Sequence, residues 1–102
     1  MFGSIQTYVM PSRVYTLFRQ AMQKRKQIVC AYDGYRRELC PVILGHSQGR
    51  EKVLAYQFGG QSKSGLPAAG QWRCLWLSKV SEDTMQASGD WATLRLCPDR
   101  RE

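Results

Sequence analysis

Two arginines on predicted β-strands are the residues of this sequence best suited to bind a ligand. Arg37 follows a predicted turn, and Arg73 lies in another predicted strand further along the chain. A guanidinium group binds two oxygens of a phosphate or carboxylate at once, and it stays protonated even in a partly dry groove. The pair therefore predicts a site for an anion, to which Lys79 adds a third positive charge.

Aromatic residues near these charges could stack on the bases of a nucleic acid. Stacking of this kind contributes roughly 1–3 kcal/mol per base. The alternative is that aromatic side chains fill the core of a small β-domain, and we favour this alternative for Tyr32 and Trp76. The predicted ligand-binding residues are Arg37, Arg73, Lys79, Tyr32, Tyr56 and Trp72.

The first arginine is positioned by a predicted β-hairpin that spans residues 28–41. Its first strand is rich in β-branched and aromatic residues, and Asp33-Gly34 suits a tight primed turn, in which both central residues need positive φ. In the second strand, Arg36 and Arg37 face opposite sides. One of them can therefore point into a concave surface while the other points to water. Periodicity alone favours the plainer alternative, in which both are solvated charges beside the turn.

The other elements follow from hydrophobic periodicity and turn residues. Apolar side chains at helical spacing predict an amphipathic helix from Ser12 to about Arg25. The basic cluster at 24–26 is expected either to close its last turn, where cations favour the negative end of the helix dipole, or to contact phosphate. Further strands are predicted at 36–46, 51–58, 72–77, 80–85 and 91–97, with a loop at 59–70 and a turn at 88–90.

A helix packed on a small, strongly bent antiparallel β-barrel satisfies this order of elements. The predicted fold class is therefore mainly β with one N-terminal α-helix. The expected single domain consists of an N-terminal arm (1–10), the helix (12–26), the β-barrel (27–97) and a charged tail (98–102).

The composition indicates a small basic domain. The chain has 102 residues, a mass of 11.7 kDa and a formal net charge of +7. No acidic side chain precedes Asp33, so positive charge is concentrated in the N-terminal third. This balance favours an anionic partner, such as nucleic acid, a nucleotide or an acidic protein. The sequence has no signal segment and no apolar run near the ~20 residues that span a bilayer, so a cytoplasmic location away from membranes is expected.

The cysteines are not arranged for a metal site. The four cysteines form no CxxC pair, and only one histidine, His46, could join them, so we expect no zinc. The thiols are expected to be free and mostly buried, as in a reducing compartment. Cys30 is predicted to lie opposite Arg37 in the hairpin, which keeps it from bridging to Cys40.

Catalytic chemistry is not expected either. The loop at 59–70 contains a lysine and serines but lacks the glycine that a phosphate-binding P-loop needs directly before its lysine. His46 lies near a predicted turn, and no nucleophile signature surrounds it. The sequence therefore predicts a protein that is not an enzyme and that holds no cofactor.

The order of short motifs along the chain resembles that of WYL domains. The helix, the strand ending in Tyr32-Asp33-Gly34 and the stretch 37–41, RELCP, are similar to the opening of that family, whose first hairpin carries an aromatic-x-Gly turn and then R-x-L-x-P. The stretch 52–56, KVLAY, sits where the family has Trp-Tyr-Leu-x-x-Tyr. Only Leu54 of that triplet is kept, because lysine replaces the tryptophan and valine the tyrosine.

A third motif extends the resemblance. The stretch 73–80, RCLWLSKV, is similar to the family's R-x-F-R-L-D-R-I segment. Arg73 matches its first arginine, Lys79 keeps the charge of its last, and Trp76 replaces the middle one. The resemblance covers residues 14–85, which is most of the chain.

The resemblance implies an SH3-like or Sm-like β-barrel without catalytic chemistry. It also implies a ligand-sensing or nucleic-acid-binding role, often in bacterial transcription regulators or defence-associated proteins, where basic residues line a groove for a negatively charged ligand. Such barrels are often joined to an N-terminal winged-helix domain, and the sequence lacks one, so this domain is expected to be solitary.

Two hypotheses about function remain open from the sequence. In the first, a groove made by Arg37, Arg73 and flanking aromatic residues binds single-stranded DNA, RNA or an anionic small molecule such as a nucleotide. In the second, the domain is a protein-interaction module or a dimerising regulatory subunit, and its basic face meets an acidic protein. The salt dependence of nucleic-acid binding distinguishes them, because its slope reports the number of phosphates contacted.

Overall fold

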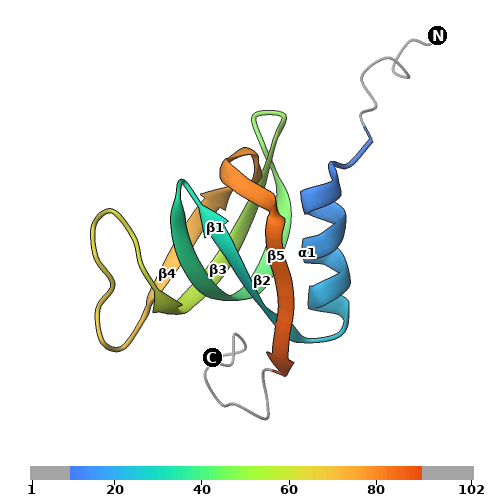
Figure 1. The fold of residues 1–102 in the computed structure, drawn as a ribbon. Coiled ribbons are helices and arrows are strands. Elements are labelled where there is room, and N and C mark those ends of the chain that lie inside the picture. Colours follow the sequence, from blue (N-terminus) through green and yellow to red (C-terminus); the bar gives the residue numbers. More distant parts are fainter. Residues whose placement is uncertain (1–9, 91–102) are drawn as a thin grey trace, which may run out of the picture.

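The computed structural model describes residues 10–90 of the chain, a mainly β structure with one helix (Figure 1). The order of elements is α1 (Arg13–Gln23), β1 (Lys26–Tyr32), β2 (Tyr35–Ser47), β3 (Arg50–Gly60), β4 (Gln71–Trp76), the short 3-10 helix η2 (Leu77–Lys79) and β5 (Val80–Asp90). Most of the predicted arm, the predicted strand at 91–97 and the predicted tail lie outside the described residues.

Helix α1 begins as predicted but ends earlier than predicted. Ser12 is its N-cap, and the Ser12 hydroxyl accepts a hydrogen bond of 3.1 Å from the backbone N–H of Tyr15. The helix ends at Gln23, and Arg25 takes the left-handed conformation with φ of 54°. The expectation that residues 24–26 close the last turn is therefore wrong, because the chain has already left the helix there.

The predicted hairpin is confirmed. Asp33 and Gly34 form its turn with φ of 53° and 84°, the two positive values that a primed turn requires. Strands β1 and β2 pair antiparallel, and Cys30 lies opposite Arg37.

The five strands form one antiparallel sheet in the order β4-β3-β2-β1-β5. Register shifts interrupt the β2–β3 and β1–β5 pairings, and such bulges bend a sheet. Over the described residues the sheet is open, with β4 and β5 at its edges. The turn predicted at 88–90 is wrong, because these residues continue β5 and the Asp90 carboxylate pairs with Lys26 at 2.8 Å.

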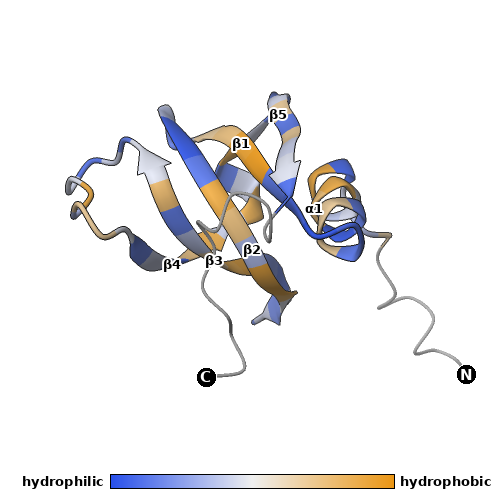
Figure 2. Cartoon of the chain, turned by 90° about the horizontal axis from the view of Figure 1, so that it is seen from below, coloured by the Kyte–Doolittle hydropathy of each residue, from blue (hydrophilic) through white to orange (hydrophobic). Residues whose placement is uncertain are grey.

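The alternation of β3 gives the sheet two different faces. Val53, Ala55 and Gln57 point to the buried side, while Leu54, Tyr56 and Phe58 stay partly exposed. We call the first side the inner face and the second the outer face. Apolar residues of the inner face form the core with Val14, Phe18 and Ala21 of α1. The helix contacts β1, β2 and β5 and lies on the side of the molecule away from β4 (Figure 2).

Substitutions of two glycines should show where the chain approaches itself most closely. Gly60 and Gly65 have nearly the same φ, 89° and 87°. A Cβ at Gly60 would meet the Arg36 carbonyl and would lie 2.9 Å from the Arg37 Cα, whereas nothing lies within 4 Å of one at Gly65. Gly65→Ala should therefore lower the free energy of unfolding by about 1 kcal/mol and Gly60→Ala by at least about 3 kcal/mol, as measured by urea unfolding. Equal losses would contradict the close approach at Gly60.

Candidate anion-binding site

Arg37 and Arg73 meet on the inner face of the sheet. Arg73 comes from β4, where it pairs with Ala55, and Arg37 comes from β2, next to the buried Leu39. Only 5% of Arg37 is exposed, so the alternative that both hairpin arginines are solvated is wrong, and only Arg36 points to water. The Arg73 charge acts on Arg37 strongly enough to lower its pKa. Two cations therefore share one region of the fold.

The surroundings of Arg37 are unfavourable for a positive charge. Burial lowers the pKa of Arg37 from its ordinary value, and repulsion by Arg73 lowers it further. The guanidinium donates from Nη1 to the Gln57 Oε1 at 3.2 Å and lies over the rings of Tyr32 and Tyr35, with centroids at 5.0 and 5.9 Å. Its Nε is buried and has no hydrogen-bond partner.

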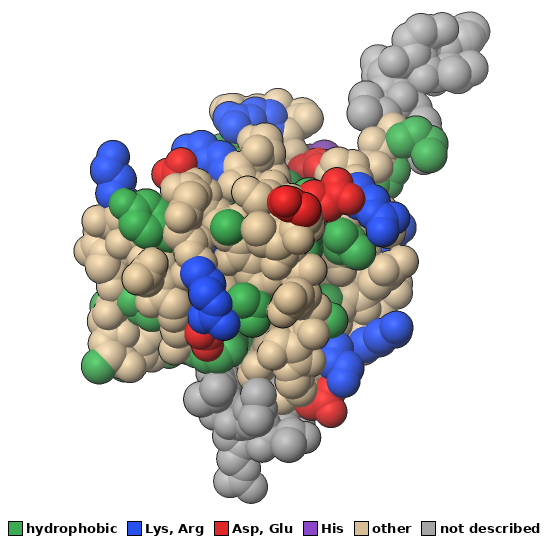
Figure 3. All heavy atoms as spheres, viewed as in Figure 1, with side chains coloured by type: hydrophobic (Ala, Val, Ile, Leu, Met, Phe, Trp, Pro, Cys, Tyr) green, Lys and Arg blue, Asp and Glu red, His purple; other side chains and the backbone are tan. Residues whose placement is uncertain are grey.

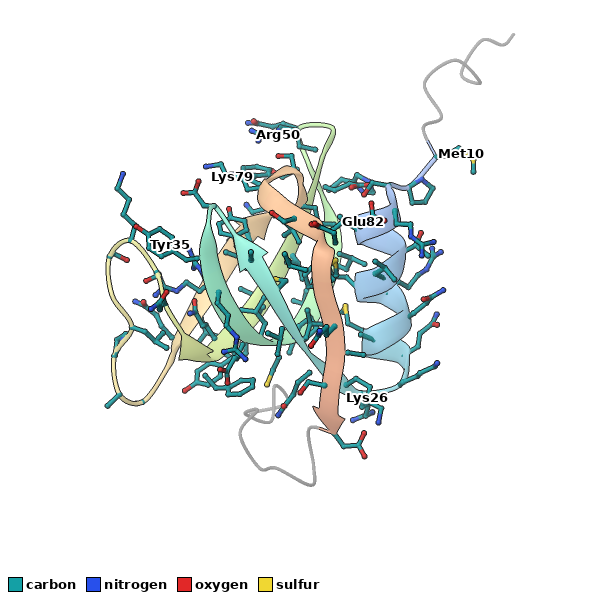
Figure 4. The ribbon with its side chains drawn as sticks, in the orientation of Figure 1. Met10, Lys26, Tyr35, Arg50, Lys79 and Glu82 are labelled. Carbon is teal, nitrogen blue, oxygen red and sulfur yellow. The ribbon has the colours of Figure 1, made fainter. Side chains whose placement is uncertain are left out.

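The loop at 61–70 supplies neutral oxygens to Arg73. The Nη2 atom of Arg73 donates to the Ser62 hydroxyl at 3.1 Å and to the Gly65 carbonyl at 2.8 Å, while Nη1 lies 3.5 Å from the Ser64 hydroxyl. The Nε of this half-buried arginine is also buried without a partner. Tyr35, whose ring lies near the Arg37 guanidinium, is on the same side of the molecule as this loop (Figure 4).

Within residues 10–90 no carboxylate forms an ion pair with either arginine, although the Asp33 charge partly offsets the lowering of the Arg37 pKa. Three ion pairs form in this part of the chain, Arg13–Glu82, Lys26–Asp90 and Arg36–Glu38, and neither Arg37 nor Arg73 takes part in them. The site therefore keeps two positive charges and two buried N–H groups that an anion could satisfy.

Gln57 organises the site, although it is not among the residues predicted from the sequence to bind a ligand. Its side chain is fully buried, accepts from Arg37 and donates to the carbonyls of Gly59 and Gln61 at 3.0 and 3.1 Å. The sequence feature that could have identified Gln57 is its position as a polar residue on the same strand face as the apolar Val53 and Ala55. A buried amide needs partners for its donor and its acceptor, and these partners are the arginine and the start of the loop.

The structure separates the six predicted ligand residues into three groups. Tyr32 lies with the two arginines on the inner face, and its hydroxyl accepts from the backbone N–H of Trp76 at 3.1 Å. Tyr56 and Trp72 lie on the outer face, where their rings pack edge to face at 5.3 Å. Lys79 is exposed in η2 and is not among the charges that shift the pKa of Arg37.

The described cysteines only partly match the expectation of free thiols. Cys30 is free and buried, as expected, whereas Cys74 is free but exposed. Cys40 is disulfide-bonded, so the expectation is wrong for this residue.

Other kinds of site find little support in the described part of the chain. Residues 10–90 contain no group of three or more His, Cys, Asp or Glu side chains that could hold a metal ion. His46 is exposed and stacks on Tyr15 at 5.3 Å. The helix found between residues 10 and 90 is not long and apolar enough to cross a membrane.

These features define a small β-rich domain with a cationic site on the inner face of its sheet. Comparisons of the chain with protein-family models, with curated proteins and with solved structures find no match.

Replacing the buried amide should destabilise the site from within. Gln57→Leu leaves Arg37 Nη1 and the carbonyls of Gly59 and Gln61 without their present partner, and each unsatisfied buried group costs about 1–3 kcal/mol. We expect the free energy of unfolding to fall by at least about 3 kcal/mol in urea titrations. Gln61→Ala is the control, because Gln61 contributes its backbone carbonyl and should change stability little. Similar losses in both variants would contradict this role of Gln57.

The Cys30 thiol should make stability fall at alkaline pH. Burial raises its pKa to about 11 from an ordinary value of 9.0, although the Arg37 charge opposes part of the rise. Between these values the folded protein keeps a proton that the unfolded chain has lost, so folding stability decreases as pH rises. We expect this group to remove roughly 2–3 kcal/mol from the free energy of unfolding across that window. Cys30→Ala should show a weaker pH dependence in urea unfolding, and an identical one would refute the assignment.

Proposed function

We propose that this chain is a non-enzymatic binding module that holds a phosphate-bearing ligand, a nucleotide or the phosphate of a nucleic acid, between Arg37 and Arg73. The observation that supports it is the pairing of two arginines on the inner face, each with a buried Nε that lacks a partner. Within residues 10–90 neither arginine has a carboxylate partner.

Electrostatics favours an anion at this position. A buried cation without a counter-ion costs several kcal/mol, and a second cation nearby increases that cost. A phosphate between the two guanidinium groups would offset the desolvation, remove the repulsion and accept hydrogen bonds from the Nε atoms. Each hydrogen bond to a charged group contributes about 1.5–3 kcal/mol.

The resemblance to WYL domains supports the same function. Arg73 occupies the first basic position of the motif at 73–80, and Arg37 occupies the arginine of the hairpin motif. In that family, basic residues line a groove for a negatively charged ligand. The proposal includes the family's SH3-like or Sm-like barrel, formed by closing the bent sheet, and a regulatory rather than catalytic role.

The test compares charge-removing variants at the site with one beside it. Calorimetric titration with inorganic pyrophosphate and with ADP should show binding by the unmodified chain, and Arg73→Gln should weaken it roughly 10- to 100-fold, the equivalent of one lost charged hydrogen bond. Arg37→Gln should have a similar effect. Arg36→Gln is the matched control, because Arg36 is exposed and pairs with Glu38, and it should bind as tightly as the unmodified chain.

A further variant separates charge from geometry. Arg73→Lys keeps the charge but loses the two-pronged contact with phosphate, so its affinity should lie between those of the unmodified chain and Arg73→Gln. Thermal unfolding without ligand verifies that each variant is folded. The proposal fails if Arg73→Gln binds both anions as well as the unmodified chain, or if Arg36→Gln loses as much affinity.

A further inference from the structure

The outer face of β3 and β4 carries a second group of side chains suited to a ligand. Its members follow from the cross-strand pairs Lys52 with Trp76, Leu54 with Cys74, and Tyr56 with Trp72. Ile43 of β2 pairs with Leu54 and extends the group. We call this group, with the adjacent Arg50, the outer platform.

The centre of the outer platform is apolar and accessible. Trp72 and Ile43 are 43% and 46% exposed, and they are two of the three large hydrophobic residues that the described part of the chain exposes to this extent. Cys74, which lies between Trp72 and Trp76 along β4, is exposed as well. The helix contacts β1, β2 and β5, so it leaves this side of β3 and β4 uncovered. An exposed apolar patch of this kind marks an interaction surface.

The ring of Trp72 has a fixed support. It packs edge to face on Tyr56, with centroids 5.3 Å apart and planes at 67°. The Tyr56 hydroxyl donates to the Ala69 carbonyl at the end of the loop. Gly70 makes this approach possible, because a Cβ there would lie 2.6 Å from the Tyr56 hydroxyl. A ring held in this way loses little conformational freedom when another flat group stacks on it.

Two cations lie at the opposite end of the platform. The Arg50 guanidinium is 4.1 Å and the Lys52 ammonium 4.9 Å from the centroid of the Trp76 ring. Neither forms an ion pair within residues 10–90, and Glu51, between them in sequence, hydrogen-bonds to Ser12 instead. Four strand positions separate Trp72 from Trp76, which corresponds to about 13 Å. The platform thus offers an aromatic surface at one end and positive charge at the other.

We propose that the outer platform is a second binding site, for single-stranded nucleic acid, in which a base stacks on Trp72 and phosphates contact Arg50 and Lys52. Exposed aromatic rings combined with cations are the features by which proteins hold single strands. A second copy of this chain is a poorer occupant, because two surfaces with unpaired cations and a net charge of +7 each would repel one another. The face over β5 and α1 shows acidic side chains between the basic ones (Figure 3). This face therefore offers single-stranded nucleic acid no comparable positive surface.

The outer platform is independent of the anion site described above. Arg37 and Arg73 lie on the inner face, whereas the platform lies on the outer face of the same sheet. The two proposals rest on different residues and are tested with different ligands, so they can fail separately.

The test is fluorescence anisotropy of a labelled oligothymidylate of about 15 nucleotides, titrated with the full chain. Trp72→Ala should weaken binding about tenfold or more, while Trp72→Phe, which keeps a stacking ring, should restore most of the affinity. Arg50→Gln and Lys52→Gln should each reduce the slope of log affinity against log salt by about one. Lys24→Gln removes an exposed lysine at the end of α1 and should leave the slope unchanged.

Competition completes the test. Polyglutamate at equal charge concentration should displace the oligonucleotide poorly, because it offers no bases to stack. The proposal is overturned if Trp72→Ala binds as tightly as the unmodified chain, or if polyglutamate competes as well as unlabelled oligothymidylate.

Discussion

The hydrogen bonds of one buried amide connect the parts of this domain that form the candidate anion site. Gln57 lies on the inner face of β3, accepts from Arg37 of β2 and donates to the two carbonyls where the chain leaves β3 for the loop at 61–70. Two neutral oxygens of the loop in turn accept hydrogen bonds from Arg73 of β4. The arrangement of three strands and the loop therefore depends on the hydrogen bonds of one side chain. Because Gln57 is buried, its amide groups cannot bond to water instead.

Hydrogen bonds and aromatic contacts stabilise the arginines of this site, whereas burial and mutual repulsion destabilise their charges. Burial and the repulsion between Arg37 and Arg73 both oppose the charged state of Arg37. Contacts with the rings of Tyr32 and Tyr35 offset part of this penalty, since an aromatic face attracts a guanidinium. Under the proposed function, this arrangement lowers the stability of the free protein in exchange for affinity, a relation common to binding sites that must keep unpaired charges.

Local patterns in the sequence predict most of the helices and strands. They do not predict how far each element extends or that the candidate ligand residues lie on two faces of the sheet. The Asp33-Gly34 turn and the strand predicted at 51–58 follow from local properties, and both are confirmed. The length of β5 depends instead on pairing with β1, a partner more than fifty positions away, so the turn predicted at 88–90 was wrong. Tyr56 and Trp72 lie on the other face of the sheet from the arginines, because side chains alternate between the two faces along each strand. This alternation shows which residues of neighbouring strands share a face only when the register between the strands is known.

The contact between Glu51 and Ser12 has a consequence for how the chain folds. Helix α1 has 11 residues, fewer than an isolated helix needs to be stable in water. Its N-cap receives the Glu51 carboxylate from the start of β3, 39 positions away. The stability of the helix therefore depends on its contacts with the sheet, to which this hydrogen bond fixes its first turn.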